Sequence, residues 1–297
     1  MQTRPGSIIR WRCPMCTLAR CRLWFVCFAV WFTAALSQAG QPQLTFFGWS
    51  DQHVQTSGDA RHLEPAIEAM NALPGTKYPE AIGGTVDAPA FVFGAGDITE
   101  WPTNAARTQY EKLITEKLKF PAYDIAGNHD TGGKVPSETI TKWLAARHGG
   151  LSYKIEQGGV VLLAVHSKYD EMSDSPAQPI HKDALEYIKA ELKKIGPDKP
   201  VIVALHLCYE AITNRDELVQ AFEGYKVILV LGGHYHRSTV HKHRGIPFVQ
   251  LPSPAPNGPR EFTVIRITAD RLVAIPYNYQ NKQWNTAPGK VLDVPLK

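Results

Sequence analysis

Short apolar runs recur along this chain, and most of them end directly before a polar cluster. The runs are rich in Val, Ile, Leu and Phe and contain four to six residues each. Runs of that length and composition, bounded by turn-forming residues, are typical of buried strands. The pattern therefore predicts strands at residues 44–49, 90–94, 122–125, 160–165, 201–205 and 227–231.

Between these runs, apolar residues recur at helical spacing. In residues 61–73, for example, one stripe contains Leu63, Ile67, Met70 and Leu73. The same spacing predicts helices at residues 104–118, 182–195 and 216–222. After residue 233 the pattern returns to strands, at residues 248–251, 262–267 and 272–277. Alternating strands and helices with a strand-rich end predict an α/β sandwich.

Five polar clusters, each close behind a predicted strand, contain the candidate chemistry. They combine Asp, His, Asn and Gly, and in chain order they are Asp51-Gln52-His53, Gly96-Asp97, Gly127-Asn128-His129-Asp130, His206 and Gly233-His234-Tyr235-His236. Ligands of α/β sheets gather outside the carboxyl ends of the strands, and all five clusters fall there. We therefore expect one common site.

These residue types suit a pair of divalent metal ions that cleaves phosphoesters. Two ions about 3.5–4 Å apart can hold the attacking and the leaving oxygen of an in-line displacement and can lower the pKa of a bridging water. Imidazole nitrogens mixed with carboxylate and carbonyl oxygens favour Mn, Fe, Zn, Ni or Co over Ca. The pair needs one carboxylate that reaches both ions, and Asp97, which follows Gly96, is the candidate.

The order of the clusters resembles the calcineurin-like metallophosphoesterase superfamily, and within it the bacterial phosphodiesterase and phosphatase branch. The family pattern runs D-x-H, G-D, G-N-H-D/E, a single H and G-H-x-H, and every part is present here. The resemblance covers residues 44–277. It implies an α/β fold, a four-layer αββα sandwich of two mixed sheets flanked by helices, and a metal-dependent phosphoric ester hydrolase with a small-molecule phosphoester substrate.

The resemblance also implies how two ions share these ligands, with Asp97 contacting both. The first ion takes Asp51, His53 and His236, and the second takes Asn128, His206 and His234. His206 has no accompanying motif residue, so the other histidines between Asp130 and Gly233 are its alternatives. These are His148 in a helical stretch, His166 at the end of a strand and His181 at the start of a helix.

By the same resemblance, His129 stands off the metals and faces the substrate as an acid or transition-state donor. A positioned general acid contributes roughly 10²–10⁴ in rate. The family orients this imidazole with a carboxylate three residues after the bridging Asp. That position is Glu100 here, one methylene longer than the usual Asp. We interpret Asp130 as a carboxylate that stabilises its own loop.

The residues after Asp97 bear on the substrate class. Serine/threonine protein phosphatases of this superfamily continue as G-D-x-x-D-R-G, whereas this chain has Trp101 and Pro102 in place of the Arg and the last Gly. A protein-phosphatase function is therefore disfavoured. Candidate phosphate or base contacts are Trp101, Tyr235 and Arg260, with packing or surface roles as the alternative. Two other functions stay open, a non-catalytic metal-binding scaffold of the same fold and a metal-dependent nuclease.

Residues 1–39 differ in composition from the rest of the chain. They contain five Arg and no acidic residue, then an apolar stretch at residues 23–36 and the small residues of Ser37-Gln38-Ala39. An apolar core of 7–15 residues before such a site is typical of a secretory signal peptide, whereas a membrane-spanning helix needs about 20. We expect cleavage after Ala39 and an extracytoplasmic protein, periplasmic or secreted, that meets the membrane only through its leader during export.

Two alternatives to this leader stay open, an uncleaved membrane anchor and a translation start at Met15, which would leave a leader of more ordinary length. Cleavage would leave one domain of residues 40–297. Without the leader, 32 basic and 28 acidic residues become 27 and 28, so nothing in the charge supports a nucleic-acid surface. Cys208 would be the last remaining cysteine, which excludes an internal disulfide. Nothing indicates an oligomeric state.

Overall fold

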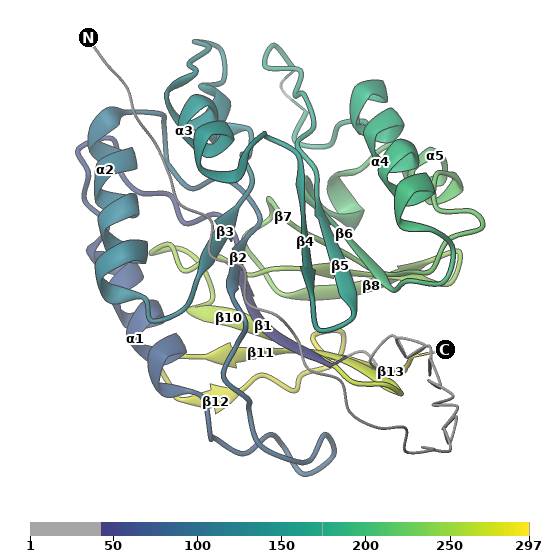
Figure 1. Ribbon diagram of the computed structural model, residues 1–297. Helices are drawn as coiled ribbons and strands as arrows, with labels where there is room; N and C mark the ends of the chain where they lie inside the picture. The colour runs from purple at the N-terminus through teal and green to yellow at the C-terminus, as the bar shows by residue number, and fades with distance from the viewer. Residues whose placement is uncertain (1–42, 174, 297) are drawn as a thin grey trace, which may run out of the picture. The chain divides into compact units, whose positions relative to one another are not determined.

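The computed structural model describes residues 43–173 and 175–296 (Figure 1). The predicted leader at residues 1–39 lies outside the described residues. Within the described ranges, no helix is both long enough and apolar enough to cross a membrane.

One sheet contains seven strands. Its order is β12-β11-β10-β1-β2-β3, and β13 pairs with β11. β1, β2 and β3 run parallel, whereas β10 and β11 add antiparallel strands, so the sheet is mixed. The strands are β1 (Leu44–Trp49), β2 (Val92–Gly94), β3 (Ala122–Asp124), β10 (Glu261–Ile267), β11 (Arg271–Asn278), β12 (Gln283–Trp284) and β13 (Leu292–Pro295).

The other sheet contains six strands in the order β4-β5-β6-β7-β9-β8. Its four inner strands are parallel and its two edge strands are antiparallel to their neighbours. The strands are β4 (Tyr153–Gln157), β5 (Val160–Ala164), β6 (Val201–Leu207), β7 (Val227–Gly233), β8 (Thr239–His243) and β9 (Ile246–Gln250).

Alternation along β1 shows how the core is divided. All six residues of β1 are buried, and successive side chains of a strand point to opposite faces. Phe46 packs in the cluster between the two sheets, where its ring lies 4.8 Å from that of Phe91. Phe47 and Trp49 pack on the other face, in the cluster beneath the helices. A strand buried on both faces needs a continuous apolar run, as predicted.

Helices cover both outer faces, which completes the four layers predicted. α1, α2 and α3 pack on the seven-stranded sheet, and α4 and α5 on the six-stranded sheet (Figure 1). Their bounds are α1 (Glu64–Ala72), α2 (Asn104–Lys112), α3 (Thr139–His148), α4 (Lys182–Ile195) and α5 (Arg215–Gln220). Short helical turns are η1 (Arg61–Leu63), η2 (Leu113–Lys117), η3 (His129–Thr131) and η4 (Tyr209–Ala211).

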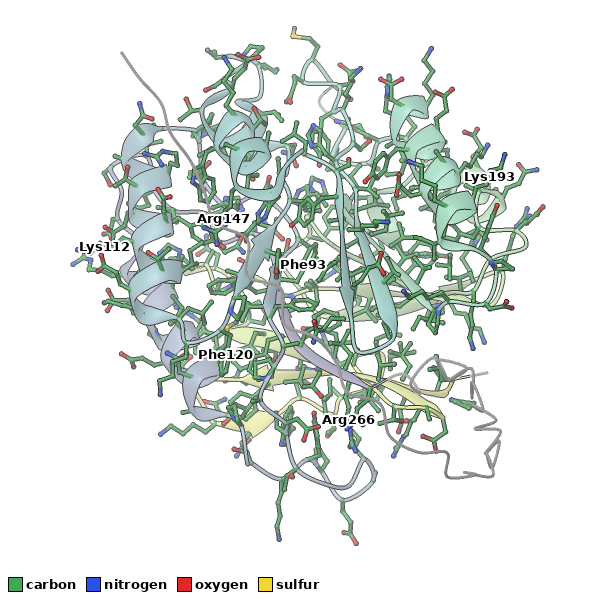
Figure 2. All side chains as sticks on the ribbon, viewed as in Figure 1. Phe93, Lys112, Phe120, Arg147, Lys193 and Arg266 are labelled. Atoms are coloured by element: carbon green, nitrogen blue, oxygen red, sulfur yellow. The ribbon has the colours of Figure 1, made fainter. Side chains whose placement is uncertain are left out.

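Side chains follow this layering. In Figure 2, Phe93 lies between the layers, whereas Lys112 of α2 and Lys193 of α4 point outward. The start of α2 is fixed by Thr103, whose hydroxyl accepts a hydrogen bond from the Ala106 N–H at 3.1 Å. Such a cap satisfies a backbone donor that the first turn of a helix leaves unpaired.

Candidate metal centre

The candidate ligands lie at the carboxyl ends of parallel strands in both sheets. Asp51 follows β1, Asp97 follows β2 and Asn128 follows β3, while His206 lies near the end of β6 and His234 directly follows β7. These ends meet at one edge of the sandwich, as the positions of ligand sites in α/β sheets predict.

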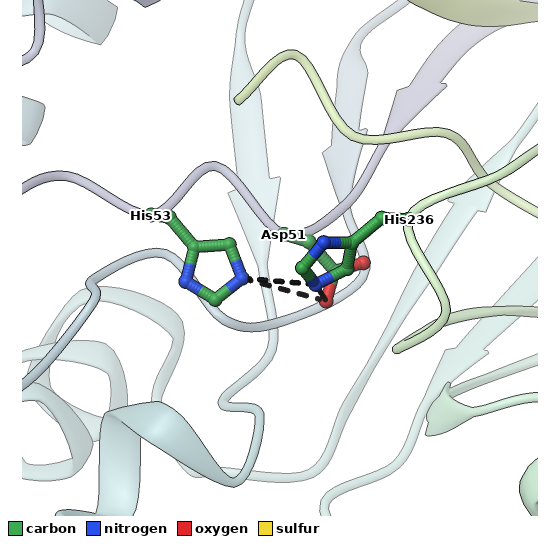
Figure 3. Close-up of side chains that lie close together, drawn as sticks. All are labelled: Asp51, His53 and His236. Carbon is green, nitrogen blue, oxygen red and sulfur yellow. Dashed lines mark hydrogen bonds and ion pairs between the residues drawn. The ribbon is translucent and has the colours of Figure 1, made fainter. Parts of the chain in front are cut away.

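The first predicted ligand group is assembled in the structure. Asp51, His53 and His236 each offer a ligand atom within 4.8 Å of the others. His53 Nε2 lies 3.1 Å from His236 Nε2, and His236 Nε2 lies 3.4 Å from Asp51 Oδ1 (Figure 3). The two imidazoles and the carboxylate thus turn their ligand atoms toward a common point.

The second predicted group is assembled beside it. Asp97, His206 and His234 offer ligand atoms within 4.8 Å of one another. His206 Nε2 lies 3.2 Å from Asp97 Oδ2. Asn128 Oδ1 lies 3.1 Å from both His206 Nε2 and His234 Nδ1. All seven candidate ligands therefore fall into the two predicted groups, and His206 is the histidine brought to the site.

The outward ring nitrogens are held by fixed acceptors. His206 Nδ1 lies 2.8 Å from the Ala95 carbonyl oxygen, and His234 Nε2 lies 2.8 Å from the Pro176 carbonyl oxygen. A carbonyl only accepts, so each of these nitrogens carries the proton and donates it. In the neutral form of each imidazole the inward nitrogen then keeps its lone pair, which is the tautomer and orientation that a metal ligand needs.

The donor atoms fit divalent cations. Asp51 Oδ2 accepts the backbone N–H of His234 at 2.9 Å, whereas the buried Asp51 Oδ1 makes no well-formed hydrogen bond. Two pairs of inward imidazole nitrogens, His53 with His236 and His234 with His206, face each other at 3.1 and 3.3 Å. Carboxylate, amide and imidazole atoms that converge in this way match the ligands of borderline divalent ions.

The backbone is strained where it presents these ligands. Positive φ angles of 48–78° occur at Asp51, His53, Asp97, His234 and His236. Such conformations in residues other than Gly cost about 1–3 kcal/mol each and persist where the surroundings fix them, often at functional sites. The close packing also explains Gly127, because a Cβ atom there would lie 2.1 Å from Asp97 Oδ1.

Burial and the two carboxylates set the charge states of the histidines. Burial lowers the pKa of His234 to about 4 and also lowers that of His53, which favours the neutral imidazole in both. Burial would lower the pKa of His206 as well, but Asp97 raises it to about 9. Asp97 also acts to raise the pKa of His53. Asp97 and Asp51 likewise act to raise the pKa of His234 and His236, so both carboxylates influence histidines of both ligand groups.

His129 stands apart from the two groups. Its Nδ1 lies 2.7 Å from the Glu100 carbonyl oxygen, and its backbone N–H donates to Asp97 Oδ1 at 2.8 Å. The Trp101 ring stacks on its imidazole with the centroids 4.6 Å apart. The remaining nitrogen, Nε2, is the one able to exchange a proton with a substrate.

Glu100 does hold His129, but through its backbone carbonyl and not, as was predicted from the sequence, through its carboxylate. The Glu100 carboxylate does not orient His129; its Oε2 lies 3.0 Å from His53 Nδ1. The extra methylene carries the carboxylate past the imidazole that a shorter Asp was expected to hold. Glu100, His53 and His129 still lie close, with ligand atoms within 4.8 Å of one another.

The interpretation of Asp130 is confirmed. Its buried carboxylate accepts the backbone N–H groups of Ile98, Thr99 and Gly127 at 2.9–3.0 Å. These bonds join the loop after β2, which carries Asp97, to the loop after β3, which carries His129. Asp130 thus fixes the distance between the two motifs.

The other candidates are placed outside the centre. His148 ends α3 and His181 is the residue before α4, while His166 lies against the Tyr169 ring. Two cavities of about 840 and 660 Å³ flank the centre, and Trp101 and His129 line both. Of the three candidate substrate contacts, Trp101 reaches the cavities; Tyr235 and Arg260 line neither.

Comparisons with known proteins agree with the motif pattern. A family model described as calcineurin-like phosphoesterase matches residues 50–238, which include all seven candidate ligands. The serine/threonine-protein phosphatase CPPED1 of Mus musculus is 24% identical over 250 residues, covering 76% of this chain and 77% of that protein. CPPED1 of Homo sapiens is 23% identical over 254 residues, covering 76% and 77%.

Among solved structures, one titled "GAP50 the anchor in the inner membrane complex of Plasmodium" has a TM-score of 0.57 at 15% sequence identity. The match covers 86% of this chain and 90% of that chain. It shows that the two proteins share a fold.

Proposed function

The chain belongs to the calcineurin-like phosphoesterase family, and we propose that it hydrolyses phosphomonoesters or phosphodiesters at a centre of two metal ions. Family membership and its phosphatase relatives make it a phosphoric ester hydrolase. The observation that carries the two-ion proposal is the pair of ligand groups, Asp51 with His53 and His236, and Asp97 with His206 and His234.

Asp97 and Asn128 have distinct proposed roles in holding the two ions. When bound, two divalent ions supply charge neutralisation at the phosphoryl oxygens and an activated water; the ligand types favour Mn, Fe, Zn, Ni or Co. Asp97 is the carboxylate suited to both ions, because its Oδ2 lies 3.2 Å from His206 Nε2 of the second group and its backbone carbonyl accepts the N–H of His53, of the first group, at 3.1 Å. Asn128 completes the second group, since its Oδ1 lies 3.1 Å from His206 Nε2.

His129 is the proposed proton donor. The carbonyl of Glu100 holds its Nδ1–H, so Nε2 is the nitrogen that gains and gives the catalytic proton. In the protonated form, Nε2–H can donate to the departing alcohol oxygen or to a non-bridging phosphoryl oxygen. The stacked Trp101 ring keeps the imidazole plane fixed while this happens.

A second substrate class is favoured by a specific observation. The relatives named serine/threonine-protein phosphatase are 23–25% identical to this chain, although Trp101 and Pro102 replace the Arg and Gly expected of the protein-phosphatase pattern. A phosphoserine or phosphothreonine side chain is itself a monoester. Phosphopeptides therefore belong in any substrate test beside small-molecule esters.

The site of action is also a proposal. The composition of residues 1–39 supports a cleaved secretory leader, and hence hydrolysis outside the cytoplasm. An extracytoplasmic enzyme would meet soluble phosphoesters and lipid-derived phosphoesters before it met nucleic acid or cytoplasmic phosphoproteins.

A hydrolysis screen tests the proposed function. The Mn-loaded protein without residues 1–39 is assayed on aryl monoesters, aryl diesters, nucleotides, cyclic nucleotides, phospholipid head groups and a phosphoserine peptide, with Asp97→Asn as the control. We expect hydrolysis of at least one small ester that the variant lacks. Bound metal without turnover on every compound would favour the scaffold, and cleavage confined to oligonucleotides would favour the nuclease.

A further inference from the structure

Exposed apolar side chains gather beside the metal centre. Among the described residues, three large apolar side chains are strongly exposed, Trp101 at 43%, Val135 at 79% and Met172 at 75%. Trp101 and Val135 line the cavity of about 840 Å³, and Met172 lies between Glu171 and Ser173, which also line it. A single exposed apolar residue is normal on a protein surface, but several around one cavity indicate a binding site for an apolar group.

The cavity continues directly from the catalytic residues. Asn128, His129 and His234 form its inner wall. A volume of about 840 Å³ falls within the range of about 300–1,000 Å³ that is usual for small-molecule sites. A phosphoryl group at the metal centre would therefore leave its organic part in this space.

The loop that carries Met172 is fixed at its base. The Asp170 N–H donates to Gln178 Oε1 at 2.8 Å, and Gln178 Nε2 donates back to the Asp170 carbonyl at 3.2 Å. The hydroxyl of Tyr169 donates to the Ala126 carbonyl at 3.1 Å. The exposure of Met172 is thus imposed by an anchored loop, which begins after β5 (Figure 1).

The loop that carries Val135 is joined to the same wall. Thr131, at its base, donates its hydroxyl to the Glu171 carboxylate of the opposite loop. The Gly133 backbone packs directly against the Trp101 ring, since a Cβ atom there would lie 2.8 Å from Trp101 Cζ3. Trp101 and Val135 therefore line the cavity, and Met172 lies on the opposite loop between the lining residues Glu171 and Ser173.

We propose that this cavity binds the hydrocarbon chain of an amphiphilic phosphoester, with the chain against Trp101 and its far end at Val135, where the exposed Met172 of the neighbouring loop can also reach it. The proposal rests on the proposed phosphoesterase function and adds the substrate class to it. Continuity with the catalytic residues favours a substrate chain over a protein partner, because Trp101 and Val135 line the same cavity as Asn128, His129 and His234.

Inhibition by n-alkylphosphonates tests the proposal. Methyl-, butyl- and octylphosphonate carry the same head group and differ in chain length alone, so they compete with hydrolysis of a small aryl ester to different extents. Burial of about 0.8 kcal/mol per methylene corresponds to up to about fourfold in Ki for each CH₂ that enters the cavity. We expect Ki to fall steadily with chain length at concentrations below micelle formation.

Variants of Val135 and Met172 test whether these residues cause the dependence of Ki on chain length. Val135→Ser and Met172→Ser, singly and together, should weaken the dependence of Ki on chain length and leave kcat/KM for the small aryl ester unchanged, because neither residue contacts the metal centre. Both side chains are so exposed that folding should be unaffected. Thr56→Ala and Asn257→Ser, in the cavity of about 660 Å³, are matched controls that should keep the full dependence.

The outcomes separate this proposal from the proposed function. A Ki independent of chain length, or a dependence that is as strong in the Val135→Ser/Met172→Ser variant as in the wild type, overturns the amphiphile proposal while aryl-ester hydrolysis stands. Absence of aryl-ester hydrolysis in the metal-loaded wild type contradicts the proposed function. In that case calorimetric titration with the same phosphonates decides whether the cavity binds hydrocarbon chains.

Discussion

At the scale of single residues, the atoms behind each imidazole determine what the site can bind. His206 and His234 donate outward to backbone carbonyls, whereas His53 Nδ1 lies 3.0 Å from the Glu100 carboxylate without a well-formed hydrogen bond. Carboxylate partners of this kind fix the ring orientation and raise the basicity of the ligand. Glu100 therefore acts through His53 as a positioning residue. Its carboxylate lies against His53, whereas its backbone carbonyl holds His129.

Substitution of Glu100 separates these two contacts. Glu100→Ala should lower the affinity for one metal ion about 10–100-fold, the usual cost of removing such a partner, while Glu100→Gln should retain more affinity because its amide oxygen keeps an acceptor within reach of His53 Nδ1. Chelator-competition titration measures both. Unchanged metal affinity together with a slower reaction in Glu100→Ala would mean that the carboxylate acts on His129 after all.

Substitution of His129 separates metal binding from proton donation. His129→Ala should keep its metal ions and lose activity in a way that depends on the leaving group. An alkyl alkoxide needs a proton in the transition state, so its loss should approach the upper part of the roughly 10²–10⁴ range for a general acid, and an aryl oxygen should lose less. Comparison of kcat/KM for matched esters measures the difference.

Two results would contradict that role for His129. Equal losses on aryl and alkyl esters would restrict the residue to positioning or neutralising the phosphoryl group. Loss of bound metal would make it a ligand.

The residue types of the site could be predicted from the sequence, but some of its contacts could not. Asp97 and His206 follow apolar runs, and that position with those side chains is a visible signal. The carbonyls of Ala95 and Pro176 leave no such signal, because every residue has a carbonyl. The prediction for Glu100 failed for the same reason, since its carbonyl and not its carboxylate holds His129.

At the scale of elements, a buried polar group ties β3 to the helices behind the site. The last residue of β3, Asp124, accepts the Tyr110 hydroxyl of α2 at 2.7 Å through Oδ1, while its buried Oδ2 has no hydrogen-bond partner among the described residues. Burial raises the pKa of Asp124 to about 6, although Tyr110 and Arg147 act to lower it. A charged carboxylate here is therefore unfavourable.

This pKa predicts a pH-dependent stability. The folded protein holds the Asp124 proton up to about pH 6, whereas the unfolded chain releases it near 3.8, so the folded state binds more protons between these values and stability falls as pH rises through them. The full loss corresponds to about 3 kcal/mol. Asp124→Asn lacks this titration. The unfolding free energy of the variant should therefore rise relative to that of the wild type from pH 4 to pH 6, and the difference should stay constant at higher pH.

Urea unfolding of both proteins across that range provides the measurement, since all other titrations are common to the pair. A difference between them that does not change with pH would show that Asp124 is charged, or hydrogen-bonded to buried water, throughout.

The elements that the sequence did not predict are those with few apolar residues. β4 and β8 lie at the two edges of the six-stranded sheet, and both are largely exposed or half-buried. An edge strand with a solvated side tolerates polar residues such as Lys154 and Lys242, so no apolar run marks it. The inner strands, buried on both faces, were predicted because continuous apolar residues are required there.

At the scale of the whole molecule, the two sheets bring together motifs that lie far apart in the chain. Asp51 and His236 are separated by 185 positions, yet their ligand atoms lie 3.4 Å apart. The pairing of β1 with β2, of β2 with β3 and of β6 with β7 sets these distances. From the sequence, the family pattern implied that the motifs meet; the apolar rim of the larger cavity was not predicted, because Val135 and Met172 lie in loops without periodicity.

Export is the prediction that concerns the whole chain. The protein recovered outside the cytoplasm should begin at Gly40, because Ser37 and Ala39 are small residues of the type that signal peptidase selects. Mass spectrometry of the intact protein provides the mass. A product that retains residues 24–31 and fractionates with membranes would favour an anchor.

The most direct test of the two-metal centre is the metal content of Asp97→Asn. The wild type should bind two divalent ions per chain. Loss of the shared charge leaves the two cations facing each other, so the variant should bind both ions more weakly and show no turnover. Elemental analysis of the purified proteins, together with kcat/KM for the best ester of the screen, decides the matter. Two ions per chain and near-normal activity in Asp97→Asn would contradict the bridge and, with it, the proposed arrangement of the site.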